Sequence, residues 1–279
     1  MEDRISLLTY ESMCKSVLAY VKPGSIHRFS AHRSDVENML TISYITGSRA
    51  SKVWRFGHEV SRGKRSILEP TFSQTIEEVL SKSLEWCGSL PRIALSMMIP
   101  VLATDLSIGL KGEPQSINSV LSMLGSTDSK ILVECIKRFY PNQYKLLYDK
   151  GYTSGFVERE NVSVLEVLEA LSTGFKEYSL ILDYSLVKSA SKTITEGVES
   201  GDSLNNSIVK AYLELIVGFL DKSSRSIVEE VFREGVMKTR DSARKLAQLD
   251  AKLRKSGVDY SYTTPLLAYA CILALYKFR

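Results

Sequence analysis

Residues 126–141 read STDSKILVECIKRFYP, and this stretch decides between a helical and a mixed fold. Its apolar centre, ILVEC at 131–135, would suit a buried strand, because a short apolar run does not distinguish strand from helix. The surroundings favour a helix: the Ser-Thr-Asp triplet at 126–128 is typical of a helix start, and a periodic segment continues up to Pro141. We therefore predict a helix that ends just before this proline.

The same helical pattern extends over most of the chain, while strand-like alternation is nearly absent. It begins with apolar residues spaced three or four apart: Cys14, Val17, Leu18 and Val21. No proline occurs between Pro141 and Pro265, which permits long helices. We predict helices at 162–173, 175–199, 205–220, 223–234 and 237–255, and a last one that Thr264 and Pro265 open. The expected fold is all-α: a single-domain helical bundle over residues 1–279, with about ten or more helices and no significant sheet.

Composition leaves the partner open but excludes several classes of protein. The 36 basic and 32 acidic residues give a net charge of +4, too small an excess to require a nucleic acid or an anionic membrane. The four cysteines lie far apart, which favours free thiols over a zinc site or disulfides. The N-terminus is charged and no tract of ~20 apolar residues appears, so we expect a cytoplasmic protein without a membrane partner. The nearest candidate for a membrane span, residues 260–276, is uncharged but contains Pro265, Thr263, Thr264 and several tyrosines, and is interpreted as a buried terminal helix.

A basic segment near the C-terminus, FREGVMKTRDSARKLAQLDAKLRKSG at 232–257, raises the question of a nucleic-acid partner. Its spacing predicts a solvated helix instead. Three leucines at 246, 249 and 253 form a stripe for burial, and Asp241–Lys245 and Asp250–Arg254 have the spacing of exposed ion pairs. The segment has no interleaved aromatics to stack on bases, so a nucleic-acid partner is not expected.

The loop VKPGSIHRF at 21–29 has the residue types of a phosphate site. Pro23 fixes its own backbone φ angle, and Gly24 can adopt backbone conformations that other residues avoid, so the chain can turn sharply beside Lys22 and Arg28. A lysine offers a point charge and an arginine a planar fork for phosphate oxygens, while Asp35 could bind magnesium or accept a proton. The alternative is a solvated turn in which Asp35 is only an N-terminal helix charge.

Two stretches resemble a known family. The sequence KPGSIHRF followed by AHRSD is similar to the N-terminal signature of the ATP:dephospho-CoA triphosphoribosyltransferase family. The sequence LDAKLRKSGVDYSYTTPLLAYACILALYKF is similar to that family's closing pattern. Together the two stretches span the chain, and the resemblance implies an all-α fold, in agreement with the helical periodicity.

The resemblance implies an enzyme that removes adenine from ATP and joins the triphosphoribosyl group to a ribose hydroxyl of dephospho-CoA. It implies catalytic roles for Asp35, as base or magnesium ligand, and for His32, which would orient a phosphate or hydroxyl. The substrate-binding residues that it implies are Lys22, Gly24, Arg28, Arg254, Thr263 and Thr264. The expected ligands are an ATP-like nucleotide with Mg²⁺ and dephospho-CoA, with no structural cofactor, and a homodimer is compatible with this expectation.

The chain also departs from the family pattern. The stretch CGSLPRIALSMMIPVL at 87–102 stands where the family carries a Gly-Thr-Asn-Thr-Asn-Leu-Gly segment, and it contains no asparagine. Residues 260–262, Tyr-Ser-Tyr, stand in place of a Pro-Gly pair, and LDKSSRSIVEE at 220–230 keeps little of a basic motif. We therefore expect a divergent transferase, with an altered substrate or a non-catalytic nucleotide- or phosphate-binding protein as the alternatives.

Overall fold

The computed structural model describes residues 1–29 and 33–278, and within these ranges the chain is all-α. Helix accounts for 76% of the structure, and no strand occurs in the described part. The expected all-α fold is thus confirmed. The α-helices are α1 (Glu2–Leu18), α2 (Arg33–Ser61), α3 (Thr71–Cys87), α4 (Ala94–Lys111), α5 (Ile117–Leu121), α6 (Ser126–Phe139), α7 (Pro141–Asp149), α8 (Ser154–Arg159), α9 (Val164–Ser172), α10 (Lys176–Leu182), α11 (Tyr184–Glu199), α12 (Leu204–Ile216), α13 (Lys222–Glu234), α14 (Arg240–Lys255) and α15 (Thr264–Phe278). Two short 3₁₀ helices, η1 (Val217–Phe219) and η2 (Ser261–Thr263), precede α13 and α15.

Helix α6 forms where the sequence predicts it, but its start differs in detail. Gly125 is the N-cap, and no side chain caps the helix. Asp128 is buried, and its Oδ1 accepts the backbone N–H of Ser73 at 2.7 Å. Pro141 opens α7 at its first position, where a missing N–H costs nothing. Asp128, which the sequence pattern places at the start of α6, thus accepts a hydrogen bond from the first turn of α3 instead of capping α6.

The predicted helix at 175–199 is two helices in the structure, α10 and α11. Asp183 separates them, because its Oδ1 accepts the N–H groups of Ser185 and Leu186 and so starts α11 afresh. The neighbouring predictions agree with α9, α12, α13 and α14 within a few residues at each end. The leucine stripe of α14 is buried as expected.

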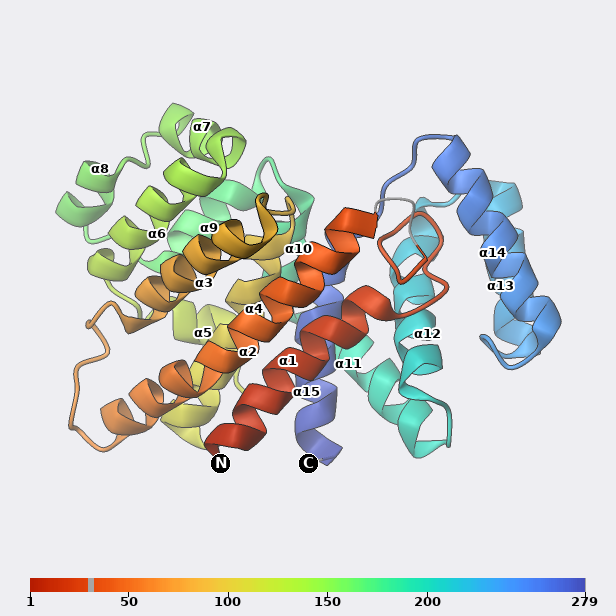
Figure 1. The fold of residues 1–279 in the computed structure, drawn as a ribbon, viewed down its shortest axis with the longest axis horizontal. Helices are drawn as coiled ribbons and strands as arrows, with labels where there is room; N and C mark the ends of the chain where they lie inside the picture. The colour runs from red at the N-terminus through yellow and green to blue at the C-terminus, as the bar shows by residue number, and fades with distance from the viewer. Residues whose placement is uncertain (30–32, 279) are drawn as a thin grey trace.

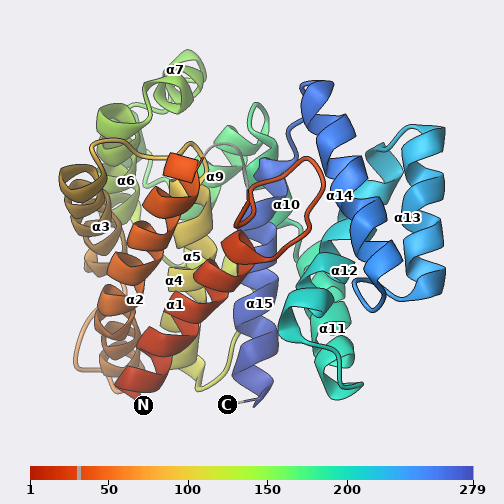
Figure 2. The same ribbon diagram turned by 45° about the vertical axis from the view of Figure 1, so that its right-hand side comes forward.

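Helix α15 lies at the centre of the molecule, with α1, α4 and α11 packed around it (Figures 1 and 2). All its residues from Thr264 to Leu275 are buried. The buried apolar side chains contributed by α1 through α15 form one cluster, which includes the α13–α14 hairpin at the edge of the molecule. The two termini lie close together, and Arg4 of α1 donates to the Tyr276 carbonyl at 3.4 Å.

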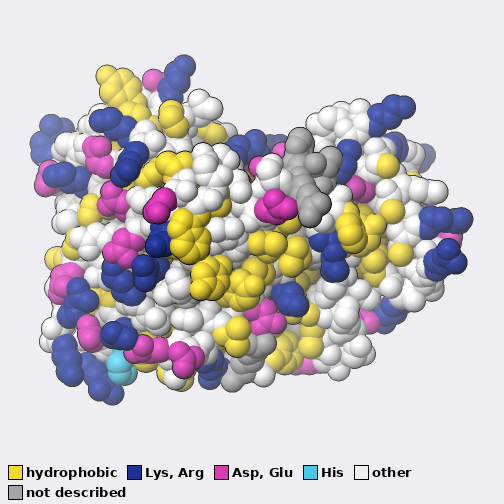
Figure 3. Space-filling model, in the orientation of Figure 1, with side chains coloured by type: hydrophobic (Ala, Val, Ile, Leu, Met, Phe, Trp, Pro, Cys, Tyr) yellow, Lys and Arg dark blue, Asp and Glu magenta, His cyan; other side chains and the backbone are white. Residues whose placement is uncertain are grey.

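Helix α4 is the one described helix that is long and apolar enough to cross a membrane, with a mean hydropathy of 1.3 over 18 residues. However, 89% of that window is buried inside the protein, which is how a core helix is placed. Figure 3 shows hydrophobic side chains gathered across the face of the molecule that α1 and α2 form. Exposed Leu7, Tyr10 and Tyr44 belong to these two helices. The expected homodimer and the single-domain boundary stay predictions.

Candidate functional site

The Lys-Pro-Gly loop lies against α14 and the turn that leads into α15. Gly24 donates its N–H to Asp250 Oδ1 at 2.8 Å, and its carbonyl accepts the N–H of Tyr260 at 2.7 Å. Its φ of +73° favours glycine, and an added Cβ would lie 3.2 Å from the Tyr260 ring. The N-terminal loop and the C-terminal segment therefore meet, which is the arrangement that the family resemblance implies.

Asp250 joins the two segments through further hydrogen bonds. Its Oδ2 lies 3.0 Å from His27 Nε2 and accepts Arg254 Nε at 2.9 Å, and Arg254 Nη2 donates to the Ser25 carbonyl at 2.5 Å. Burial alone would raise the pKa of Asp250, but the hydrogen bonds from His27, Arg254 and Gly24 outweigh it and lower the pKa. The Asp250 side chain is only 13% exposed, so the prediction of a solvated surface pair with Arg254 is wrong.

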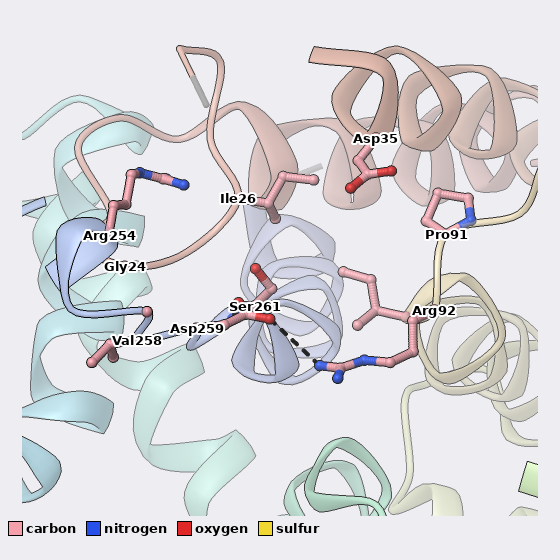
Figure 4. A pocket seen from close by; sticks show the side chains of 11 residues that line it. Gly24, Ile26, Asp35, Pro91, Arg92, Arg254, Val258, Asp259 and Ser261 are labelled. Carbon is pink, nitrogen blue, oxygen red and sulfur yellow. Dashed lines mark hydrogen bonds and ion pairs between the residues drawn. The ribbon is translucent and has the colours of Figure 1, made fainter. Parts of the chain in front are cut away.

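A pocket of about 300 Å³ opens beside this cluster (Figure 4). It lies between the loop, the first turn of α2, the segment before α4 and the turn between α14 and η2. Its lining includes Gly24, Ile26, Asp35, Arg92, Arg254 and Asp259. Segments that lie more than 200 residues apart in the sequence therefore share one concave site.

Charged side chains of both signs face this pocket. Asp35 and Arg254 lie on opposite sides of it in Figure 4, and the Arg254 side chain is 28% exposed. Arg92 Nη2 lies 3.7 Å from Asp259 Oδ2, a contact between two exposed side chains that is worth little and can open for a ligand. The two guanidinium groups suit phosphate oxygens, and the Asp35 carboxylate suits a metal ion or a hydroxyl proton.

The residues fit a magnesium ion only together with a ligand. The described part of the chain holds no group of three or more His, Cys, Asp or Glu side chains that could bind a metal. Magnesium nevertheless binds to proteins through one or two carboxylates plus substrate phosphates and waters. Asp35 is exposed at the pocket and makes no hydrogen bond or ion pair with the described residues, so it can supply such a carboxylate.

Lys22 does not lie in this pocket. Its side chain is fully buried, and its ammonium donates to the Ser16 carbonyl near the end of α1. Burial lowers the pKa of Lys22 to about 7, because it disfavours the charged form, and the nearby Cys271 thiol opposes the shift only in part. The expectation that Lys22 offers a charge to phosphate therefore has to be corrected: the lysine faces the core.

Arg28 and the two threonines also lie away from the pocket. Arg28 donates to the Leu18 carbonyl and to Asn205 Oδ1, both at 3.1 Å, and lines a separate hollow of about 240 Å³. Thr263 Oγ1 donates to the Tyr260 carbonyl at 2.8 Å, and buried Thr264 lies 3.5 Å from the Ser25 hydroxyl. These threonines make contacts within the junction, and neither of them lines the pocket. His32 lies outside the described residues.

Of the predicted site residues, the structure thus brings together Gly24, Asp35 and Arg254. Four further residues were not predicted as site residues: Arg92 and Asp259 line the pocket, and His27 and Asp250 lie in the hydrogen-bonded cluster beside it. A signal was present for Arg92, because it belongs to the stretch 87–102, which the sequence analysis singled out as divergent. Comparisons of the chain with protein-family models, with curated proteins and with solved structures find no match.

Proposed function

We propose that the pocket between Asp35, Arg92 and Arg254 binds a phosphorylated nucleotide, and that the chain is a divergent transferase of the triphosphoribosyl-dephospho-CoA synthase type. One observation supports this proposal above the others. The two stretches that resemble the family's end motifs, at 22–35 and 249–278, both contribute lining residues to one pocket, and the divergent stretch 87–102 adds Arg92 to it. Helical packing alone does not require that convergence.

The arginines bind the phosphates in this proposal. Arg254 is already oriented by Asp250 and by the Ser25 carbonyl, so little side-chain entropy is lost when it binds an anion. Arg92 exchanges its weak contact with Asp259 for phosphate oxygens. The pocket volume is at the lower end of the range of roughly 300 to 1,000 Å³ that is typical of ligand sites, so it suits part of a nucleotide and not two whole substrates.

The transfer step needs a base. Of the two lining carboxylates, Asp259 accepts the Ser261 N–H and contacts Arg92, whereas Asp35 has no such partner among the described residues and is the proposed base. The acceptor hydroxyl oxygen attacks the anomeric carbon of the nucleotide ribose while its proton passes to Asp35. The bond from that carbon to the adenine nitrogen breaks, and adenine leaves with the electron pair and takes up a proton. In the alternative role, Asp35 would hold a magnesium ion that enters with the nucleotide, and the ion would neutralise negative charge on the phosphates.

A second candidate is a nucleotide-binding protein without catalysis. It is favoured by the inward orientation of Lys22 and by Arg92 in the stretch where the family carries asparagines. Phosphate binding needs only the arginines, whereas displacement also needs the acceptor aligned with the anomeric carbon.

Calorimetric titration with Mg-ATP tests the binding, with Arg92→Gln as the pocket variant and Lys64→Gln as the control. Lys64 is exposed and remote from the pocket lining, so its loss changes the net charge alone. We expect saturable binding to the native chain, about tenfold weaker binding to Arg92→Gln and no change in the control. The absence of saturable heat would contradict both candidates.

Chromatographic detection of adenine separates the two candidates. A transferase releases adenine when Mg-ATP and dephospho-CoA are both present, and Asp35→Asn abolishes that release. Binding without adenine release from the native chain would reject transfer between these two substrates and support the non-catalytic candidate.

A further inference from the structure

A second and larger pocket, of about 670 Å³, lies between α11, α15 and the connection from α4 to α5. It shares no lining residue with the proposed nucleotide pocket. Lys188 and Lys192 project from α11, Lys277 projects from α15, and Tyr184 and Tyr276 complete much of the wall. The volume lies within the range of small-molecule sites.

The aromatic wall is held in place by contacts outside the pocket. The Tyr276 hydroxyl donates to the Gly112 carbonyl at 2.7 Å, and the Arg4 guanidinium lies 5.3 Å from the centre of the Tyr276 ring. The Tyr184 ring stacks on buried Tyr269 with 6.3 Å between centroids. Leu273, 9% exposed, adds aliphatic surface. A planar ring could therefore pack against a surface that is already formed.

The charge of this pocket is strongly one-sided. Lys188 and Lys277 have no carboxylate within 4.0 Å in the described structure, and Lys192 has only exposed Glu196 at 3.6 Å. Glu113 is the single acidic residue in the lining, where its carboxylate accepts a hydrogen bond from Gln115 at 3.0 Å. Ser191 is only 5% exposed, and its hydroxyl makes no hydrogen bond with the residues described, so it can donate to a ligand.

We propose that this second pocket binds a small aromatic anion. The ring packs against Tyr184 and Tyr276, and a carboxylate, sulfonate or phosphate group lies between the ammonium groups of Lys188 and Lys277. Exposed lysines alone hold an anion weakly, because water and salt screen them. The Lys188 ammonium already lies 5.7 Å from the centre of the Tyr184 ring, so an anion bound there would also lie beside the aromatic wall. The ring contacts supply the apolar contribution, and the two ammonium groups, which lack a carboxylate partner among the described residues, select for negative charge.

Fluorescence titration with anilinonaphthalene sulfonate, an aromatic anion, tests this proposal. We expect single-site saturation, and about tenfold weaker binding in the double variant Lys188→Gln with Lys277→Gln. The matched control is Lys64→Gln with Lys150→Gln, which removes the same charge from two exposed lysines outside the pocket. Thermal unfolding followed by circular dichroism verifies that each variant is folded.

A pocket-filling variant and an uncharged probe test the same proposal in two further ways. Ser189→Trp places a bulky side chain at the exposed lining position and should abolish saturation without lowering the unfolding midpoint. Phenylnaphthylamine, which has the rings without the sulfonate, should bind at least about tenfold more weakly than the anion. Equal affinities in the two double variants, or no saturation up to about 1 mM probe, would overturn the proposal.

Discussion

Asp250 stabilises the junction between the two ends of the chain, and Asp250→Ala should expose its contribution. The carboxylate accepts the Gly24 N–H at 2.8 Å and Arg254 Nε at 2.9 Å, and it lies 3.0 Å from His27 Nε2. His27 and Gly24 are buried, so their polar groups do not regain water when the carboxylate is removed. The loss therefore includes the desolvation of the groups left behind.

The magnitude follows from these contacts. A hydrogen bond to a charged group contributes about 1.5 to 3 kcal/mol, and breaking a buried ion pair costs about 3 to 5 kcal/mol. Because Arg254 is partly exposed and keeps the Ser25 carbonyl, we take the lower end and expect a loss of about 3 kcal/mol. For a protein of this size, that corresponds to a fall in the unfolding midpoint of roughly 6 °C.

Urea unfolding followed by circular dichroism measures this loss. Asp241→Ala is the matched control, because Asp241 lies on the same helix and pairs with Lys245 at the same spacing, yet is 45% exposed. The control should lose much less stability, because Asp241 is exposed to water and Lys245 keeps its contacts with Glu230 and Glu234. Equal losses in the two variants would refute the reasoning that Asp250 joins two segments of the fold.

Three further predictions concern buried charge and backbone conformation. The pKa of Lys22 is lowered to about 7 in the folded protein, so between pH 7 and 10 the unfolded chain binds more protons at this residue than the folded chain does. The free energy of unfolding should therefore rise with pH in this range, by up to about 1.4 kcal/mol per pH unit relative to the variant Lys22→Met. Gly24→Ala should lower stability by about 1 to 2 kcal/mol in urea, because its φ of +73° is strained for alanine and Tyr260 lies against the added methyl group. Burial raises the pKa of Asp128 to about 6, although the hydrogen bond from the Ser73 backbone opposes the shift. The folded state therefore binds more protons than the unfolded state between about pH 4 and 6, and the free energy of unfolding should fall as pH rises through that range. The variant Asp128→Asn should show a weaker dependence of stability on pH there.

The helices were predictable wherever local signals agreed with burial. The apolar run of α6 and the leucine stripe of α14 give both the helix and its buried face. The break at Asp183 was missed, because an aspartate inside a periodic run can be an exposed side chain or the cap of a new helix. The hydrogen bonds that its side chain accepts from the N–H groups of Ser185 and Leu186 make it the cap of a new helix.

The site was predictable only in outline. The resemblance placed the loop at 22–35 and the segment at 250–264 together, and Gly24 and Arg254 do line one pocket. The direction of Lys22 was not predictable, because a lysine beside a proline-glycine turn can point to solvent or to a helix carbonyl. Similarly, an i,i+4 pair such as Asp250–Arg254 has the same spacing on a surface as beneath a packed loop.

A crystal structure with a non-hydrolysable ATP analogue and Mg²⁺ would show directly whether the pocket between Asp35, Arg92 and Arg254 binds a nucleotide. We expect phosphate oxygens within hydrogen-bonding distance of Arg92 and Arg254, with the ligand beside Asp35. Density for the analogue at Lys188 and Lys277 instead, or an unchanged pocket at a concentration that saturates the calorimetric signal, would contradict it.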